Sequence, residues 1–325
     1  MVAGKLEAVF LFPGQGAQYP GMAMDLFEAS VAVRDLFRTA SMAAGRDMER
    51  LLGTAKADEL KRSDIAQPAI TLANLAAATL LLEHGVVPSA CAGFSLGEYA
   101  ALAVAGVLSV EDCFRLVAAR GAAMQKAADG IAAGTAGDVP GMAAVLGLPC
   151  DTVEALIGEW KDKGLEGLYA ANFNSPRQTV VAGTSAALAE AETRFKAAGA
   201  KRVLRLQVAG PFHSPLVAEA AREFSPLLDA VAFADPVLPL FSNVTGGRVA
   251  SGGEAKRLAL RQITGSVRWT AEEAALAALA ELAVLEAGPG KVLAGLWKDS
   301  GSSVPCLAAG TAVDIAGALA ALKGA

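Results

Sequence analysis

The segment that most constrains the fold of this chain is Gly93-Phe94-Ser95-Leu96-Gly97. It lies between a run of small residues at 89–93, which predicts a short strand, and a helix-like pattern at 96–105. A serine between two glycines at such a turn matches the G-x-S-x-G nucleophile elbow, whose tight geometry exposes the hydroxyl. Backbone N–H groups at the helix N-terminus favour negative charge that develops there. The segment predicts an α/β fold with Ser95 as a nucleophile; the alternative is a chance match in a glycine-rich chain.

Short apolar runs alternate with stretches of helical periodicity along the chain, which is typical of α/β proteins. Residues 8–12 are continuously apolar and end at Pro13-Gly14, as expected of a strand buried on both faces of a parallel sheet. The expected strands are 8–12, 89–93, 142–146, 168–172, 178–182, 202–206, 238–242 and 282–286. The expected helices are two or three in all within 26–52 and 65–84, followed by 96–105, 110–128, 150–163, 186–198, 215–228, 270–279 and 290–298.

A second unit interrupts the α/β pattern. Glycines and small residues crowd 129–141, which predicts a hinge between domains. The β-α-β-β-α-β order that follows is that of a ferredoxin-like split unit. We therefore expect an α/β-hydrolase-like large subdomain with a parallel sheet, formed by 1–130 and 207–325, and an inserted ferredoxin-like small subdomain at 131–206.

Composition excludes several classes of protein. Hydrophobic residues make up 54% of the 325 and charged residues 19%, which excludes intrinsic disorder and coiled coils. The formal net charge of −5 argues against nucleic acid as a partner. No apolar run approaches the ~18 residues of a membrane span, and the early residues, with Glu7 in the apolar run, lack a signal-peptide pattern. We expect a cytoplasmic protein.

The cysteines predict neither a disulfide framework nor a zinc site. All four are far apart in the chain, and none forms a C-x-x-C pair. We interpret Cys91, Cys113, Cys150 and Cys306 as structural thiols and expect no metal site.

A serine hydroxyl needs a neighbouring base to become a good nucleophile at neutral pH. The chain contains two histidines, His84 and His213. His84 lies at the end of a predicted helix, where a histidine fits the helix dipole and needs no catalytic role. His213 lies in a loop between Pro211 and Pro215, which restrict its backbone. We expect His213 to be the base for Ser95; the alternative is a structural histidine.

The loop Phe12-Pro13-Gly14-Gln15-Gly16 follows the first predicted strand. Open α/β sheets place their sites at this carboxyl end, and backbone N–H groups there can face an oxyanion. No Gly-Lys-Ser/Thr or G-x-G-x-x-G pattern follows, so the two glycines do not predict a phosphate loop. The alternative is an ordinary turn.

Together these residues resemble the malonyl-CoA:acyl carrier protein transacylases of fatty acid synthesis and the related acyltransferases of polyketide synthases. The resemblance covers nearly the whole chain. The matching segments, in order, are Leu11-Phe12-Pro13-Gly14-Gln15-Gly16, Gln67-Pro68-Ala69, Gly93-Phe94-Ser95-Leu96-Gly97-Glu98-Tyr99, Arg120-Gly121 with Met124, Asn172-Phe173-Asn174-Ser175-Pro176, Phe212-His213-Ser214-Pro215-Leu216, Ser242-Asn243-Val244 and Gly288-Pro289-Gly290-Lys291.

The resemblance implies a two-step transfer. Ser95 would take a malonyl group from coenzyme A as an ester, with His213 as the base that returns the proton to the departing thiol, and an acyl carrier protein would accept the group. The backbone N–H groups of Gln15 and Leu96 would form the oxyanion hole. A backbone carbonyl near Gln262, rather than an aspartate, would orient His213. The coenzyme A thioester is the substrate, so no cofactor is expected.

The resemblance also assigns the malonyl carboxylate to Arg120, helped by Gln67. The guanidinium group is a rigid fork that binds a carboxylate through two hydrogen bonds, which agrees with this role. Without the resemblance, an arginine late in a helix would complement the dipole or form a surface ion pair. Met124, one turn beyond Arg120, is expected to line the same site.

Phe212 and Phe94 bear on the choice of acyl group. The bulk of Phe212 would fill the space needed by an α-branch such as that of methylmalonate. Phe94 stands where the family usually has histidine, immediately before the nucleophile, and we expect it to line the wall and to influence the choice of extender unit. Asn172 and Asn243 are the remaining residues expected to contact substrate.

Rival interpretations remain open at this point. A serine thioesterase or esterase would use the same elbow with water as acceptor, but it would need an acid in the triad and no arginine. An acyltransferase subunit of a malonate decarboxylase, an acyltransferase for another extender unit, and a non-catalytic carrier-docking module are the others. Carrier proteins are acidic, so lysine and arginine are expected near the mouth of the site. The candidates are Lys201, Arg202 and Arg205, or Lys291; the alternative is ordinary solvated charge. We expect a monomer.

Overall fold

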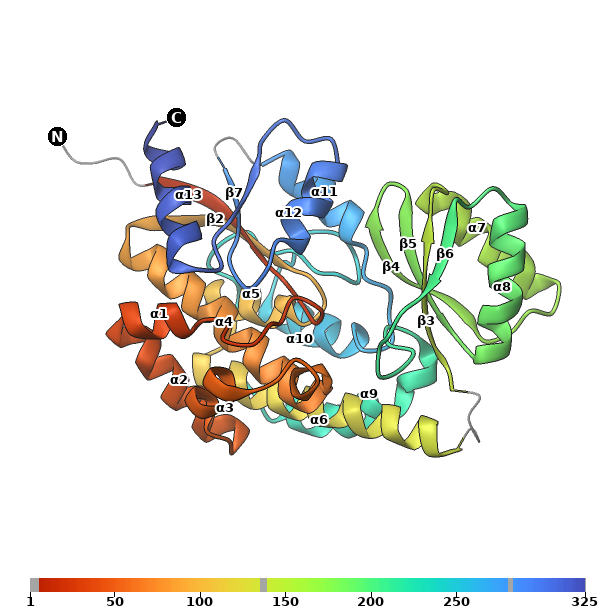
Figure 1. The fold of residues 1–325 in the computed structure, drawn as a ribbon, viewed down its shortest axis with the longest axis horizontal. Helices are drawn as coiled ribbons and strands as arrows, with labels where there is room; N and C mark the ends of the chain where they lie inside the picture. The colour runs from red at the N-terminus through yellow and green to blue at the C-terminus, as the bar shows by residue number, and fades with distance from the viewer. Residues whose placement is uncertain (1–5, 135–138, 280–282, 325) are drawn as a thin grey trace.

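Strand β1 (Leu6–Phe12) occupies the interior of the first of two sheets in the computed structural model, which describes residues 6–134, 139–279 and 283–324 (Figure 1). The strand order is β2-β1-β7-β8, with β2 at Val86–Gly93, β7 at Val284–Glu286 and β8 at Cys306–Ala308. All three pairings are parallel. The chain therefore has the α/β fold with a parallel sheet that its pattern predicts.

Both faces of β1 are buried, as its continuous apolar run predicts. Phe10 and Phe12 belong to the large apolar cluster on one face, while Val9 and Leu11 pack with Trp269 on the other. Successive side chains of a strand point to opposite faces, so a strand covered on both sides must be apolar throughout. This placement fixes the loop after Phe12 at the carboxyl edge of the sheet.

Two long helices, α4 and α6, pack against each other on the first of these faces. Helix α4 (Ser63–Glu83) is long and apolar enough to cross a membrane, but 89% of its most apolar window is buried inside the protein, as in a core helix. The helices of the first half are α1 (Met24–Ala29), α2 (Val31–Ala44), α3 (Met48–Thr54), η1 (Glu59–Lys61), α4, α5 (Gly97–Val104) and α6 (Val110–Gly134). Those of the second half, apart from α7 and α8, are η2 (Pro215–Val217), α9 (Ala218–Asp229), α10 (Gly252–Arg261), α11 (Trp269–Ala277), α12 (Val292–Asp299) and α13 (Ala312–Gly324).

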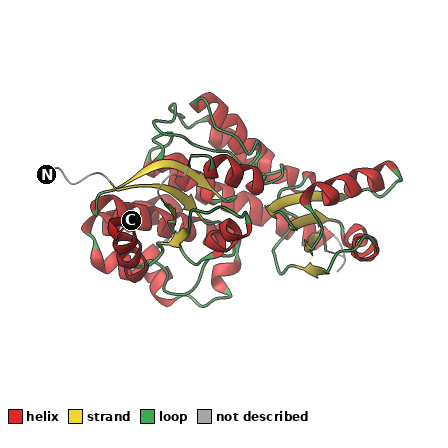
Figure 2. Ribbon diagram, turned by 90° about the horizontal axis from the view of Figure 1, so that it is seen from above, coloured by secondary structure: helices red, strands yellow, loops and turns green. Residues whose placement is uncertain are grey.

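The second sheet is antiparallel and lies to one side of the first (Figure 2). Its order is β4-β5-β3-β6, formed by β3 (Gly141–Leu146), β4 (Leu168–Ser175), β5 (Gln178–Gly183) and β6 (Arg202–Arg205). Helices α7 (Cys150–Asp162) and α8 (Ser185–Ala197) contribute Trp160 and Phe195 to a separate apolar cluster, with ring centroids 4.7 Å apart. This unit therefore has a core of its own.

Three sequence expectations need correction. Helix α6 continues to Gly134, so the part of the expected hinge at 129–134 is helical. Alanines on either side favour the helix, and Gly130 costs it only about 1 kcal/mol; residues 135–138 lie outside the described residues. The expected strand 238–242 is reduced to two isolated bridges, a parallel one between Leu240 and Cys91 and an antiparallel one between Phe241 and Arg248. Both follow Pro239, which has no N–H to donate. Finally, α10, β8 and α13 were not predicted.

The elbow glycines allow helix α5 to lie directly on β1. A Cβ atom added at Gly97 would be 1.9 Å from the carbonyl oxygen of Phe12, and one added at Gly93 would be 2.0 Å from the carbonyl carbon of Gly97. Contacts this short with backbone atoms cannot be relieved by rotating a side chain. The two glycines are therefore required by the packing of the strand and the helix.

Replacing Gly97 by alanine is expected to lower the free energy of unfolding by about 3 kcal/mol or more, since the backbone of β1 or α5 must move. Gly158→Ala is the matched control: Gly158 lies on the exposed side of α7 with nothing within 4 Å of an added Cβ, so the change should add up to about 1 kcal/mol of stability. Urea unfolding followed by circular dichroism measures both. Equal stability of the two variants would contradict the packing argument.

Candidate active site

Ser95 and His213 form a hydrogen-bonded pair. The Ser95 Oγ atom lies 2.7 Å from His213 Nε2. Both residues have left-handed backbone conformations, with φ of 51° and 56° respectively. Such values are uncommon for residues other than glycine and are held in place by the surrounding structure. The sharp turn at Ser95 is the elbow that the G-x-S-x-G segment predicts.

The backbone carbonyl of Gln262 orients the histidine. Its oxygen lies 2.9 Å from His213 Nδ1, so Nδ1 carries the proton and donates it to this carbonyl. The other ring nitrogen, Nε2, is then free to accept the proton of the Ser95 hydroxyl. Among the described residues, no carboxylate hydrogen-bonds to His213. The resemblance led us to expect this arrangement of a serine, a histidine and a carbonyl.

Burial keeps His213 neutral. The side chain is 5% exposed, and burial, followed by the nearby charge of Arg120, lowers its pKa to about 4. The bonds to Gln262 and Gly265 act in the opposite direction and are weaker. At neutral pH the imidazole is therefore in the form that accepts a proton.

Two backbone N–H groups are available for an oxyanion. Gln15 and Leu96 line the same cavity as Ser95. Within the described part of the chain, neither backbone N–H has a hydrogen-bond acceptor. Preorganised donors of this kind stabilise the negative oxygen of a tetrahedral intermediate. Their placement is consistent with the expected oxyanion hole.

Arg120 is a buried cation without an acidic partner in the described ranges. Its Nη1 donates to Gln67 Oε1 at 2.8 Å, and its Nη2 donates to Gln262 Oε1 at 3.0 Å. The guanidinium lies over the Tyr99 ring at 5.5 Å. Burial lowers its pKa, although an arginine remains charged at neutral pH. An unpaired buried charge is costly, so a site of this kind favours an anionic ligand.

The crossing of α4 and α6 brings Arg120 to Gln67. An added Cβ at Gly121 would lie 2.6 Å from the carbonyl oxygen of Ser63, so the glycine is what allows this close approach. One turn beyond the arginine, the Met124 sulfur lies 3.3 Å from Gln67 Nε2. Arg120 and Met124 line the cavity, while Gln67 lies behind them and acts on the site through Arg120.

The cavity lies between the two sheets and has a volume of about 650 Å³. The unit that contains the parallel sheet supplies Ser95, His213 and Arg120 to the cavity, together with Phe94 and Phe212. From the second unit come Met142, Asn172, Asn174, Gln178 and Val180. Asn172 is therefore at the cavity, as expected. A bound acyl group would touch both units.

The two phenylalanines form part of the apolar wall. Phe94 packs edge-on against Trp269, with ring centroids 5.5 Å apart. Phe212 is 7% exposed and also lines the cavity. Neither carries a proton-transfer group, so His213 remains the base at this wall.

Asn243 lies behind the nucleophile rather than in the cavity. Its Oδ1 accepts from the Ser95 backbone N–H at 2.6 Å, and its Nδ2 donates to the Gly93 carbonyl at 2.7 Å. The side chain is fully buried and does not line the cavity. We expected a substrate contact here; instead these polar groups hold the elbow.

Sequence reasoning missed the two carboxyls behind Asn243. Glu98 Oε2 accepts from the Asn243 N–H at 3.1 Å and from Gln262 Nε2 at 2.8 Å, and Glu272 Oε1 accepts from Asn243 Nδ2 at 2.7 Å. Burial raises the pKa of Glu98 to about 7 and that of Glu272 well above its usual range. An acid in the first turn of a helix is ordinarily an exposed partner of the dipole, so only the packing of α5 reveals the role of Glu98.

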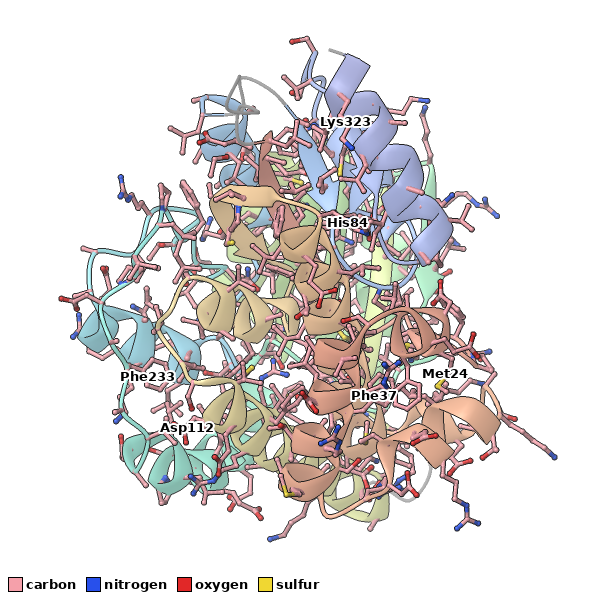
Figure 3. The ribbon with its side chains drawn as sticks, turned by 90° about the vertical axis from the view of Figure 1, so that its left-hand side faces the viewer. Met24, Phe37, His84, Asp112, Phe233 and Lys323 are labelled. Atoms are coloured by element: carbon pink, nitrogen blue, oxygen red, sulfur yellow. The ribbon has the colours of Figure 1, made fainter. Side chains whose placement is uncertain are left out.

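The other titratable candidates lie away from the site. His84 follows α4 and is exposed (Figure 3). The four cysteines are free thiols, three buried and Cys306 half-buried. Within 6–134, 139–279 and 283–324, no group of three His, Cys, Asp or Glu side chains could hold a metal ion.

Comparison with known proteins decides the family. A sequence model of the acyl transferase domain matches residues 9–320. The chain belongs to the acyl transferase family. A malonyl CoA-acyl carrier protein transacylase of Escherichia coli O157:H7 is 38% identical over 295 residues, covering 90% of this acyl transferase and 92% of that protein. A protein of the same name from Bacillus subtilis (strain 168) is 35% identical over 292 residues, covering 90% of each.

Solved structures of related proteins share the fold of this acyl transferase. The structure of MCAT from Streptococcus pneumoniae has a TM-score of 0.88 at 34% identity and covers 98% of this chain and 100% of that one. A type II PKS acyl-carrier protein in complex with its malonyl-transacylase gives a TM-score of 0.88 at 33% identity, with coverage of 98% and 100%.

The pKa of His213 predicts how reactivity at Ser95 depends on pH. Labelling of Ser95 by a fluorophosphonate probe should keep its rate from pH 8 down to about pH 5.5, because a base of pKa about 4 stays neutral over this range. A histidine of ordinary pKa would lose about tenfold by pH 5.5. Intact mass spectrometry follows the adduct, and Ser95→Ala is the blank. A midpoint near pH 6.5 would contradict the effect of burial.

Proposed function

We propose that this chain transfers a malonyl group from malonyl-CoA to the phosphopantetheine thiol of an acyl carrier protein, in fatty acid or polyketide synthesis. The observation that carries the proposal is the buried Arg120, which forms no ion pair with any described residue and lines the same cavity as the Ser95–His213 pair. A thioester with a free carboxylate at its far end would present its carbonyl to Ser95 and its negative charge to Arg120. The relatives from Escherichia coli O157:H7 and Bacillus subtilis and the malonyl-transacylase solved with its carrier protein have names that agree with it.

The geometry supports a two-step mechanism. In the first step, His213 Nε2 takes the proton of Ser95, Oγ attacks the thioester carbonyl, and the N–H groups of Gln15 and Leu96 stabilise the oxyanion. The intermediate collapses, the C–S bond breaks, and the imidazolium gives its proton to the departing coenzyme A thiolate. In the second step, the carrier thiol gives its proton to His213 and its sulfur attacks the seryl ester carbonyl. The C–Oγ bond then breaks, and the imidazolium returns its proton to Oγ, which regenerates Ser95. The reaction is therefore ping-pong.

The carboxylate contact sets the position of the acyl group. With two of the five Arg120 N–H donors on amide oxygens, the others remain for a carboxylate. Binding at this point would hold the thioester carbonyl toward Ser95 and lower the entropy cost of reaching the transition state. An acetyl group cannot make this contact, so we propose that malonyl is preferred.

The acyl carrier protein is proposed as the second substrate. Carrier proteins are acidic, and the cavity rim includes Lys61 and Arg62, although both also form ion pairs with nearby aspartates. The basic residues singled out in the sequence, Lys201, Arg202, Arg205 and Lys291, are exposed but do not line the cavity.

We propose the subdomain organisation suggested by the sequence. An α/β-hydrolase-like large subdomain would comprise 1–130 and 207–325, and a ferredoxin-like small subdomain 131–206. The support is the separate core of the second sheet and its β-α-β-β-α-β order from β3 to β6. The cavity then lies at the junction of the two.

The remaining expectations stand as proposals. Serine, histidine and backbone groups supply the nucleophile, the base and the oxyanion donors, so the reaction would need no metal or cofactor beyond the coenzyme A thioester. We also propose a cytoplasmic monomer that binds neither nucleic acid nor membrane. The net charge of −5 agrees with the first of these exclusions.

Brief incubation with malonyl-CoA should give a malonyl adduct on the protein by intact mass, absent in Ser95→Ala and chased onto a carrier protein bearing its free thiol. In Arg120→Ala, malonyl loading should fall at least about 100-fold while acetyl loading falls far less, because only malonyl loses a charged contact. Equal loading of acetyl by the natural protein would contradict the carboxylate role. Loss of the adduct to water instead of the carrier would favour the thioesterase alternative.

Phe212→Ala should raise the rate of methylmalonyl loading relative to malonyl by about tenfold, since the phenyl ring occupies space that an α-methyl group needs. Competition between the two coenzyme A esters, read by adduct mass, measures the ratio. Tyr19→Ala removes an aromatic ring outside the cavity lining and serves as the control. An unchanged ratio in Phe212→Ala would show that another residue excludes the branch.

A further inference from the structure

The side chain of Gln262 links Arg120, the backbone of the nucleophile and Glu98. Its Oε1 accepts from Arg120 Nη2 at 3.0 Å, while its Nε2 donates to the Ser95 carbonyl at 2.9 Å and to Glu98 Oε2 at 2.8 Å. The residue is fully buried. Its backbone carbonyl separately orients His213. The expectation from the sequence concerned this carbonyl alone.

We propose that the Gln262 side chain is a specificity-determining positioning residue, which bridges Arg120 and Glu98 and so reserves the arginine charge for the carboxylate of the acyl group. This inference rests on the proposed malonyl transfer and adds the interaction that keeps Arg120 from pairing with a protein acid. It concerns the side chain only, because any residue at this position offers the backbone carbonyl to the histidine.

The hydrogen bonds fix which end of the amide faces the arginine. Three oxygen acceptors lie within 3.2 Å of Nε2, namely the Ser95 carbonyl, Glu98 Oε2 and Asn243 Oδ1. Reversing the amide would place Oε1 against these oxygens and the NH₂ group against the guanidinium, which has donors only. The neutral carbonyl end must therefore face Arg120.

The amide also separates two groups of opposite charge. Glu98 is the acid that interacts electrostatically with Arg120, yet the two form no ion pair, and each instead bonds to one end of the Gln262 amide. Direct contact would produce a buried ion pair, and the substrate carboxylate would have to compete with it. A neutral bridge lets the arginine keep its orientation without losing its charge to a protein acid.

The test compares malonyl and acetyl loading in two variants. Gln262→Glu places a carboxylate beside Arg120 Nη2, and Gln262→Leu removes the bridge at similar volume. In both, the ratio of malonyl to acetyl loading rates should fall at least about tenfold. Each loading rate is divided by the fluorophosphonate labelling rate of the same variant, so that damage to the Ser95–His213 pair cancels. Thr54→Glu is the control, because it adds the same negative charge at an exposed position of α3 that does not line the cavity.

A second substitution separates the bridge from a general structural role. In Gln262→Leu, the additional change Glu98→Gln removes the acid with which Arg120 could pair, and the malonyl-to-acetyl ratio should recover at least about threefold. If Gln262 served only to stabilise the fold, the ratio would not fall in the single variant, and the second change would not restore it. The leucine variants decide the matter if the glutamate variant does not fold.

The outcomes distinguish this inference from the proposed function. A natural protein that prefers malonyl, together with ratios that stay within about twofold in both Gln262 variants, overturns the inference and leaves the malonyl transfer intact. A natural protein that does not load malonyl at all overturns the proposed function first, and the inference with it. A ratio that falls in both Gln262 variants, recovers with Glu98→Gln and is unaffected by Thr54→Glu supports the bridge.

Discussion

The left-handed backbone of Ser95 is the constraint on which the rest of the site depends. This conformation costs an ordinary residue roughly 1–2 kcal/mol, and the surrounding structure must hold it. The Ser95 N–H donates to Asn243 at 2.6 Å, the preceding N–H of Phe94 donates to the Phe12 carbonyl at 2.9 Å, and Gly97 allows α5 to lie on β1. The nucleophile is thus fixed by the central strand and the core behind it. A rigid support of this kind is what places the hydroxyl within 2.7 Å of His213.

Amides, rather than ion pairs, organise the charges around this turn. The side-chain amides of Gln67 and Gln262 accept hydrogen bonds from Arg120. The Gln262 side-chain amide and the backbone N–H of Asn243 donate to Glu98. Burial raises the pKa of Glu98 to about 7 and lowers that of His213 to about 4. At neutral pH the histidine is consequently an uncharged base, while the arginine keeps its charge. One environment therefore suits both tasks, because burial that keeps the base neutral also strengthens the attraction of the arginine for an anion.

Features with a local sequence signature could be predicted, and features that arise from long-range packing could not. The apolar run of β1, the elbow at Ser95 and the proline-bracketed loop of His213 each follow from residues close together in the chain. The roles of Asn243 and Glu98 depend on contact between segments about 145 positions apart in the chain. The local periodicity of the sequence cannot predict such a contact. Helix α6 shows the opposite failure. The glycine-rich stretch at 129–141 predicted a hinge, but flanking alanines favour the helix and residues 129–134 are helical. Asn243 was expected to contact substrate, but its side chain is fully buried and accepts a hydrogen bond from the Ser95 backbone N–H instead.

The selectivity for charge and the selectivity for shape come from different sides of the cavity. Arg120 lies on α6, is held by the buried amides of Gln67 and Gln262, and would bind a carboxylate. Phe94 and Phe212 shape the wall beside the Ser95–His213 pair, and Phe94 is held by Trp269, whose indole N–H donates to Glu273 at 2.8 Å. The aromatic residue before the nucleophile therefore shapes the wall without taking part in the hydrogen bonds that hold the arginine or the base. The two sets of contacts share no hydrogen bond. A change in which α-branch the cavity accepts need not alter its selectivity for acyl groups that carry a free carboxylate.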